Sequence, residues 1–182
     1  MKIACIGWGS LIWNPGNLLI HRKWFEDGPF LPVEFLRKST GGRLTLVLSN
    51  NIKPVRTLWS LMATEDLNIA IDSLREREGI PESKKNISIG VFRSTDATDN
   101  HFSSEIKNWA VNLNLDAVVW TNLNSNFKDD ESLPSKEEAI SYIRSLDINK
   151  RQNAEEYIRK APRQIDTEFR RFFEMELGWT AF

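Results

Sequence analysis

Short apolar runs dominate the first third of the chain and predict β-strands. Residues 2–6 are short and apolar after Lys2, and they end at glycines, which is typical of a buried strand. Residues 33–39 and 43–49 are joined across a Gly-Gly pair at 41–42, a two-residue hairpin signal. Residues 55–63 are a further candidate strand, rich in leucine. The pattern therefore predicts one hairpin and two other strands in this region.

The hydrophobic period changes at Thr64, where apolar residues begin to recur at helical spacing. Thr64 is the expected N-cap of this helix, and Gly79 marks its expected end. Strands are predicted over 87–92 and 116–121, with a helix at about 103–113 between them.

The last third of the chain predicts helices. Ser135 and Glu138 have the spacing of a capping box, which opens a helix to about residue 146. Two more helices are expected at roughly 150–161 and 167–177, because a proline divides them and a glycine follows the second. Strands followed by helices favour an α+β fold.

The composition is that of an ordinary globular protein. The 182 residues carry 24 basic and 25 acidic side chains, a net charge of −1. We expect a single domain over 1–182, with a helical C-terminal extension at about 134–182 packed on it. The near-zero charge gives no overall field for nucleic acid or an anionic membrane surface. Because no apolar stretch approaches the roughly 20 residues of a membrane span, no membrane association is expected either.

The start of the chain is apolar but meets Gly7 and Gly9 too early for a signal peptide. It is therefore expected to be the first strand, in a cytoplasmic protein. Seven tryptophans stand against only two tyrosines. Trp59, Trp109 and Trp120 fall on predicted core elements, where an indole needs no functional explanation.

Metal ligands are scarce. Cys5 is the only cysteine, which excludes an internal disulfide framework and a cysteine-based zinc cluster, and it is expected to be an inert buried thiol. His21 and His101 are the only histidines, and each is expected at the surface or hydrogen-bonded. The acidic patch 129–131 lacks the framework of a calcium loop and is expected to be solvated. We therefore expect no metal site and no cofactor.

A glycine-rich loop after the first strand is the first candidate for chemistry. Its backbone N–H groups could hold an anion or an oxyanion beside a strand end. A dinucleotide fingerprint is disfavoured because Ile12 replaces its third glycine, and a nucleophile elbow because G-x-S-x-G is absent. A plain tight turn is the remaining alternative. The loop residues are Gly7, Trp8, Gly9, Ser10 and Leu11.

Glu78 is the second candidate. It lies four residues after Leu74 and continues the apolar stripe of its helix, whereas Glu76 falls on the solvent side. A carboxylate on the inward face is costly unless it is paired, which makes it a candidate general base. The alternative is that the last helical turn frays and Glu78 reaches solvent, paired with a neighbouring arginine.

The basic C-terminal stretch, residues 150–171, is the third candidate. It holds seven basic and four acidic side chains and Phe169, and Phe172 and Phe173 follow directly. A nucleic-acid interface is one interpretation, but charges of mixed sign fit ion pairing on helix surfaces over an aromatic core. One of its arginines could still bind a substrate carboxylate.

The first two candidates coincide with a known pattern. The run Ile-Gly-Trp-Gly-Ser-Leu-Ile-Trp-Asn-Pro-Gly at 6–16 resembles the opening of the gamma-glutamylcyclotransferase superfamily, and its continuation is similar to the glutathione-specific branch. A later helix of that family ends in Glu-Gly, which resembles Glu78-Gly79 here. The resemblance covers roughly residues 1–121.

This resemblance implies a mixed-strand β-barrel flanked by helices and an enzyme, a cyclising lyase or acyltransferase. The substrate's own α-amine attacks its γ-carbonyl, and 5-oxoproline and a free amine are formed. Carried over, Glu78 is the acid/base, and Gly9, Ser10 and Leu11 hold the glutamyl carboxylate or the oxyanion. The implied partner is a small-molecule gamma-glutamyl compound, and a homodimer is compatible with the pattern.

Two departures from the family motif bear on the reaction. The motif tyrosine is Trp8 here, which leaves an indole N–H in place of a phenol. The tyrosine that the family places after Glu-Gly is also absent, since the next strand offers Phe92. Both tyrosines of the chain, Tyr142 and Tyr157, lie in the C-terminal helices. A non-catalytic protein that binds a small ligand or a partner on the same fold is therefore the alternative hypothesis.

Overall fold

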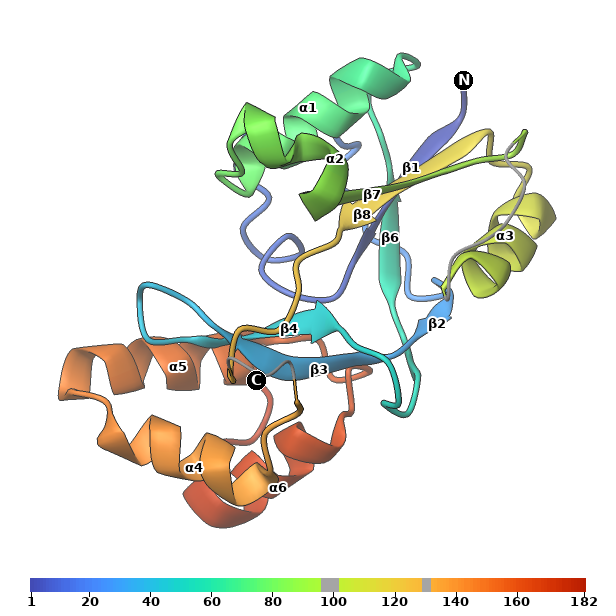
Figure 1. Ribbon diagram of the computed structural model, residues 1–182. Coiled ribbons are helices and arrows are strands. Elements are labelled where there is room, and N and C mark those ends of the chain that lie inside the picture. Colours follow the sequence, from blue (N-terminus) through green and yellow to red (C-terminus); the bar gives the residue numbers. More distant parts are fainter. Residues whose placement is uncertain (96–101, 129–131) are drawn as a thin grey trace. The chain divides into compact units, whose positions relative to one another are not determined.

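A computed structural model describes residues 1–95, 102–128 and 132–182 (Figure 1). The chain divides into two compact units, and each is described by itself. The first unit comprises Met1–Gly7, Asn14–Leu31 and Arg56–Leu123. The second comprises Trp8–Trp13, Pro32–Val55 and Asn124–Phe182.

The described residues form eight strands, six α-helices and one short 3-10 turn, at Glu82–Lys84. The strands are β1 (Ile3–Gly7), β2 (Phe30–Leu31), β3 (Val33–Lys38), β4 (Leu44–Leu48), β5 (Val55–Arg56), β6 (Leu58–Leu61), β7 (Ile89–Arg93) and β8 (Ala117–Thr121). The helices are α1 (Leu67–Arg77), α2 (Lys85–Ser88), α3 (Ser103–Asn112), α4 (Lys136–Ser145), α5 (Ile148–Lys160) and α6 (Glu168–Leu177).

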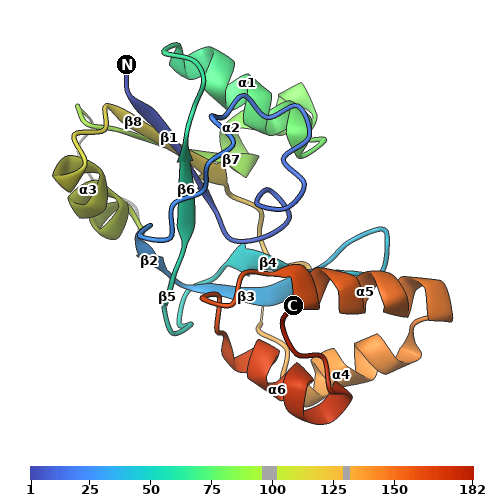
Figure 2. The ribbon, with the colours of Figure 1, turned by 180° about the vertical axis from the view of Figure 1, so that it is seen from behind.

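The first unit is built on a mixed four-stranded sheet in the order β6-β1-β8-β7. β1 pairs in parallel with β8, whereas the other two pairings are antiparallel. Helices α1 and α2 cover one face of this sheet and α3 covers the other (Figures 1 and 2). The central strand β1 is buried along its whole length, which is why its sequence is continuously apolar.

An aromatic cluster fills the α3 side of the sheet. The indole of Trp59 on β6 stacks on Phe25, with ring centroids 4.6 Å apart, and meets Trp109 of α3 edge-on at 5.4 Å. Both indole N–H groups donate to Asp27, one to its carboxylate and one to its backbone carbonyl. Trp59 and Trp120 are buried as predicted, and Trp109 is half-buried.

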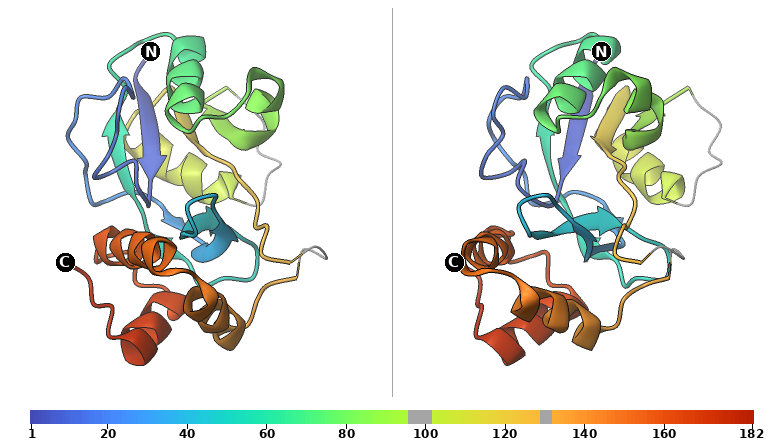
Figure 3. Two further views of the ribbon diagram at one scale, coloured as in Figure 1. Left: turned by 90° about the vertical axis from the view of Figure 1, so that its left-hand side faces the viewer. Right: turned by 60° about the vertical axis from the view of Figure 1, so that its left-hand side comes forward.

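The second unit is built on the antiparallel hairpin β3–β4, with helices α4 to α6 on one side of it (Figure 3). Phe35 of β3 is completely buried and meets Phe173 of α6 edge-on, with ring centroids 5.8 Å apart. α4 begins with the predicted capping box, in which Ser135 and Glu138 each bind the other's backbone N–H.

Two buried charged residues hold α6 in the second unit. Glu34 on β3 accepts hydrogen bonds from the backbone N–H groups of Phe35 (2.9 Å) and Phe169 (3.2 Å), the latter in the first turn of α6. Burial nevertheless raises the pKa of the Glu34 carboxyl from its ordinary value of 4.5 to about 7. Arg170 donates to four backbone carbonyls, which lie at the end of α5 and in the loop before α6.

The predicted α+β class and the mixed sheet flanked by helices are confirmed. A closed barrel is not confirmed, because the described strands form three separate sheets: the four-stranded sheet, the β3–β4 hairpin and the short pair β2–β5. In the four-stranded sheet, β6 and β7 are the outer strands in the order.

Several predicted boundaries are wrong for local reasons. The strand expected over 55–63 is broken at Thr57, whose backbone N–H and hydroxyl both donate to the carbonyl of Pro29. The N-cap of α1 is Asp66 and not Thr64, since the Asp66 carboxylate accepts from two N–H groups of the first turn. The hairpin turn has three residues between the hydrogen-bonded Ser39 and Arg43. Strand β2 and helix α2 were not predicted.

Within the described ranges, none of the helices has the length and apolar character that crossing a membrane requires.

Candidate functional site

The glycine-rich loop that follows β1 is largely buried. Gly7 is the last residue of β1 and pairs with Leu58 of β6, so it belongs to the first unit. Trp8, Gly9 and Leu11 are buried in the second unit, and Ser10 is half-buried. The loop is tightened by a hydrogen bond from the Ile12 N–H to the Gly9 carbonyl, 3.0 Å long.

The residue in the position of the motif tyrosine has a structural contact. The indole N–H of Trp8 donates to the backbone carbonyl of Leu46 on β4, over 3.2 Å, and Trp8 is 5% exposed. Since an indole has one polar hydrogen and no acceptor, this bond uses its whole hydrogen-bonding capacity. Trp8 therefore anchors the loop to the hairpin.

Tyr157 lies beside the loop and was not predicted to belong to the site. A Cβ on Gly9 would be 2.5 Å from the Tyr157 hydroxyl oxygen, so the phenol occupies the space that a side chain at residue 9 would need. Tyr157 comes from α5, almost 150 residues later in the sequence, and no local pattern links the two. The glycine at this position is thus explained by the close approach of a side chain, since its φ is not positive.

Aromatic contacts fix the Tyr157 ring in place. Trp13 meets it edge-on with centroids 5.4 Å apart, Phe35 does so at 6.4 Å, and the ring residue is 7% exposed. The guanidinium carbon of Arg43 lies over the ring, 5.9 Å from its centroid. The backbone N–H of Leu46 donates to the Tyr157 hydroxyl over 3.4 Å.

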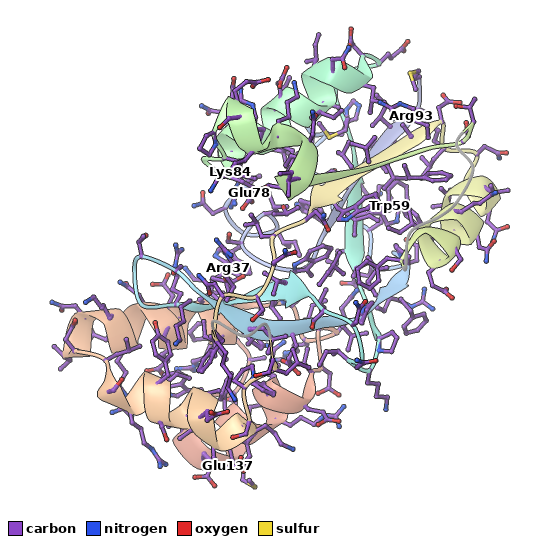
Figure 4. All side chains as sticks on the ribbon, viewed as in Figure 1. Arg37, Trp59, Glu78, Lys84, Arg93 and Glu137 are labelled. Carbon is purple, nitrogen blue, oxygen red and sulfur yellow. The ribbon has the colours of Figure 1, made fainter. Side chains whose placement is uncertain are left out.

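Glu78 lies at the end of α1, as Figure 4 shows. The helix does not fray there. The N–H of Gly79 donates to the carbonyl of Glu76 and the N–H of Ile80 to that of Arg75, and Gly79 is left-handed with φ 64°. These two bonds form a Schellman motif, which fixes the position of the Glu78 backbone.

The Glu78 carboxylate is paired and mostly sheltered. It accepts a hydrogen bond from the Arg77 guanidinium at 2.5 Å. The Glu78 side chain is 17% exposed and the Arg77 side chain is 11% exposed. The sheltered position of the carboxylate agrees with the inward placement expected for Glu78. The alternative is wrong about fraying and solvent exposure, and only its pairing with a neighbouring arginine is present. The Glu78 charge is also close to Cys5, where burial first and Glu78 second raise the pKa of the thiol to about 12. The predicted burial of the Cys5 thiol is confirmed.

Arg77 connects the helix end to the turn that follows the motif loop. Its second guanidinium nitrogen donates to the backbone carbonyl of Asn14 over 2.6 Å, and its side chain packs near Gly16. Asn14 and Gly16 belong to the run at 6–16 that carries the family resemblance. Within the first unit, the structure thus brings the last residues of that run to the carboxylate-bearing end of α1.

The candidate residues are divided between the units. Gly7 and Glu78 belong to the first unit, and Trp8, Gly9, Ser10 and Leu11 to the second. Each of the two groups is ordered by contacts inside its own unit.

The other candidates have structural explanations or fall outside the described residues. In the C-terminal stretch, surface ion pairs join helix neighbours as predicted, for example Arg159 with Glu155 at 3.0 Å. His21 is exposed, whereas His101 and the acidic patch 129–131 lie outside the described residues. Among the residues that the structure describes, no three His, Cys, Asp or Glu side chains are grouped so that they could hold a metal ion.

A scan of the chain against models of known protein families gives no match. Searches among curated proteins and among solved structures give none either. The likeness to the gamma-glutamylcyclotransferase superfamily therefore rests on the motif residues.

Proposed function

We propose that this protein is a gamma-glutamylcyclotransferase-like enzyme, with Glu78 as its general acid/base and the loop Gly7–Leu11 as its substrate-binding segment. The observation that carries the proposal is the fixed and sheltered Glu78 carboxylate, whose partner Arg77 also binds the end of the motif run at Asn14. A general base has to be held in one geometry, and the Schellman motif supports that requirement.

The proposed reaction is an intramolecular acyl transfer. Glu78 takes a proton from the substrate's α-ammonium, and the free amine attacks the γ-carbonyl carbon to form a five-membered ring. The backbone N–H groups at Gly9, Ser10 and Leu11 stabilise the resulting oxyanion. When the tetrahedral intermediate collapses, the amide C–N bond breaks and Glu78 returns its proton to the leaving nitrogen. The ring nitrogen still carries two hydrogens after the attack and passes the extra proton to the released amine, so that the products are the neutral lactam and an ammonium ion.

The substrate supplies both the nucleophile and the electrophile in this reaction. The protein therefore has to contribute positioning, one proton carrier and oxyanion donors, and the reaction as written uses no cofactor. The proposal expects a cytoplasmic enzyme and a small-molecule gamma-glutamyl compound as its substrate, glutathione included.

A non-catalytic ligand-binding protein on the same fold is the second candidate. The observation that favours it is the structural role of Trp8, because the indole N–H that replaces the family's phenol already binds the Leu46 carbonyl. If the phenol takes part in the family's reaction, its loss would remove turnover and leave binding.

A panel of gamma-glutamyl compounds distinguishes the two candidates. The protein is incubated with glutathione, gamma-glutamyl dipeptides and gamma-glutamyl amines, and 5-oxoproline is measured. Formation of 5-oxoproline from a panel member, abolished in Glu78→Gln, supports the enzyme. No product, together with a rise in melting temperature on adding a panel member, supports the binding protein. No product and no shift with any member contradict both.

A further inference from the structure

Glu34 links β3 to the start of α6 through hydrogen bonds to both of its carboxyl oxygens. One oxygen accepts from the Phe35 N–H on β3 itself, and the other accepts from the Phe169 N–H in the first turn of α6. The Thr167 hydroxyl, from the N-cap residue of α6, also forms a hydrogen bond with this carboxyl. Since Glu34 is 1% exposed, these donors replace the water that a carboxyl normally binds.

The two strands of the hairpin do not balance a charge on Glu34. Val47 lies opposite it on β4, and β4 carries no charged side chain. The basic residues of β3, Arg37 and Lys38, lie at its far end and donate to backbone carbonyls in the segment 124–127. A positive partner for an ionised Glu34 therefore has to come from the helices.

The charged residues of the helices near Glu34 are paired with other groups. Glu168 in the first turn of α6 has the same charge as an ionised Glu34, and it lies 3.7 Å from Lys136 of α4. Arg171 is also near Glu34, but its guanidinium donates to both carboxylate oxygens of Asp166, over 2.8 and 2.9 Å. No ion pair among the described residues includes Glu34.

The protonation of Glu34 is therefore coupled to the packing of α6 on β3, the closed state. Burial outweighs the hydrogen bonds that favour the ionised form, and it raises the pKa of the carboxyl from 4.5 to about 7. When α6 has moved away and Glu34 meets water, the open state, this pKa returns to its ordinary value. Because the closed state binds the proton more tightly, closure weakens as the pH rises from about 4.5 to 7 and changes little above that range.

The contacts of α6 allow it to leave β3 without unfolding. Its helical hydrogen bonds are internal, and among the described residues no backbone hydrogen bond joins it to β3. Arg170 donates to backbone carbonyls at the end of α5 and in the loop that follows, so these bonds attach α6 to α5 and not to the hairpin. The edge-on contact between Phe35 and Phe173 opposes the separation, but it does not depend on pH.

We propose that Glu34 is a pH-sensitive switch for α6: its carboxyl holds the helix on β3 while protonated and lets the helix open from the hairpin once ionised. The opening exposes Phe35 and Phe173, which are completely buried in the closed state. The switch does not depend on the proposed function, since none of its residues belongs to the candidate site.

Hydrogen exchange of the backbone amides, followed by NMR on the whole chain, tests this proposal. Protection factors correct for the intrinsic dependence of exchange on pH, so they report the opening of each segment. In wild type, the protection of α6 should fall by roughly 100-fold between pH 4.5 and pH 7, because the closed state binds one proton more than the open state. In dilute urea, this exchange should depend on urea less than that of β1, since a local opening exposes less surface than global unfolding.

Two variants assign the effect to one carboxyl. Glu34→Gln cannot ionise, so its α6 protection should stay constant within about threefold over this pH range. Glu168→Gln removes a carboxylate from the first turn of the same helix, but that side chain is 63% exposed, so the fall should remain. Equal pH profiles of wild type and Glu34→Gln overturn the proposal.

The wild-type profile decides the question by itself if Glu34→Gln does not fold. A protection of α6 that stays constant between pH 4.5 and pH 7 overturns the switch. Exchange of α6 with the same urea dependence as β1 overturns the local opening, because the helix then opens only when the chain unfolds globally. A fall of the expected size with a weaker urea dependence supports both.

Discussion

Replacing Gly9 by alanine places a methyl group in space that the Tyr157 hydroxyl already occupies. The new Cβ would be 2.5 Å from the phenol oxygen, about 0.9 Å inside the 3.4 Å at which ordinary contacts begin. The backbone at Gly9 is not left-handed, so alanine adds no conformational strain. We therefore expect Gly9→Ala to lower the free energy of unfolding by about 1–3 kcal/mol, through overpacking alone.

Removing the phenol oxygen should relieve this clash. In Tyr157→Phe the nearest atom to the new Cβ is the ring carbon Cζ at 3.5 Å, an ordinary van der Waals contact. Tyr157→Phe by itself should lower the free energy of unfolding by about 0.5–1.5 kcal/mol, because the backbone N–H of Leu46 loses the hydroxyl that accepts its hydrogen bond. Adding Gly9→Ala to this variant should cost nothing more, and a small gain of about 0.4–1 kcal/mol is expected from the restricted unfolded chain.

The assay is a double-mutant cycle by urea denaturation, supported by melting temperatures. The coupling free energy between residues 9 and 157 is the cost of Gly9→Ala beside tyrosine less its effect beside phenylalanine, and about 1.4–4 kcal/mol is expected. For a chain of this size, each kcal/mol corresponds to roughly 2–4 °C in melting temperature. If Gly9→Ala is equally destabilising with Tyr157 and with Phe at that position, the close approach is not what requires the glycine, and the reasoning is refuted.

Three further predictions concern stability. Between about pH 4.5 and pH 7, the free energy of unfolding of wild type should fall by roughly 3 kcal/mol relative to that of Glu34→Gln. The reason is that the Glu34 carboxyl ionises in this range in the unfolded chain, while the buried carboxyl keeps its proton. Parallel pH profiles of the two proteins would contradict this prediction. Arg170→Ala should lower the free energy of unfolding by about 3 kcal/mol or more, because four backbone carbonyls lose their donor. Arg171 is exposed, and Arg171→Ala should lower it by under about 1 kcal/mol in the same urea titration. Equal losses in the two variants would contradict the structural role of Arg170. Gly90→Ala should lower the free energy of unfolding by about 1–3 kcal/mol or more, because the new Cβ would be 2.1 Å from the buried Trp120 indole. An unchanged melting temperature would contradict this close contact.

Local patterns were sufficient where the stabilising contacts are local. The capping box of α4 depends on Ser135 and Glu138 three residues apart, and both hydrogen bonds are present. The end of α1 at Gly79 follows from the left-handed residue that a Schellman motif needs. The N-cap of α1 was misplaced because Thr64 and Asp66 both have capping side chains, and the Asp66 carboxylate is the one that binds the first turn.

Long-range contacts determined what the sequence could not predict. The strand break at Thr57 comes from hydrogen bonds to Pro29, and Arg170 is buried because carbonyls from two segments converge on it. Tyr157 had no pattern that linked it to Gly9, and only its approach to the loop identifies it as part of the candidate site. In the sequence, the replacement of the motif tyrosine by Trp8 was the only sign that a tyrosine from another segment could lie beside the loop.

The most direct test of the proposed function is the rate of 5-oxoproline release by Glu78→Gln, with Glu76→Gln as the matched control. Both changes neutralise one carboxylate at the C-terminal end of α1, but the Glu76 side chain is 70% exposed and that of Glu78 is 17% exposed. With the best gamma-glutamyl substrate, Glu78→Gln should lose at least about 100-fold in kcat, and Glu76→Gln should stay near wild type. Equal rates for Glu78→Gln and wild type would contradict the role of Glu78 as acid/base.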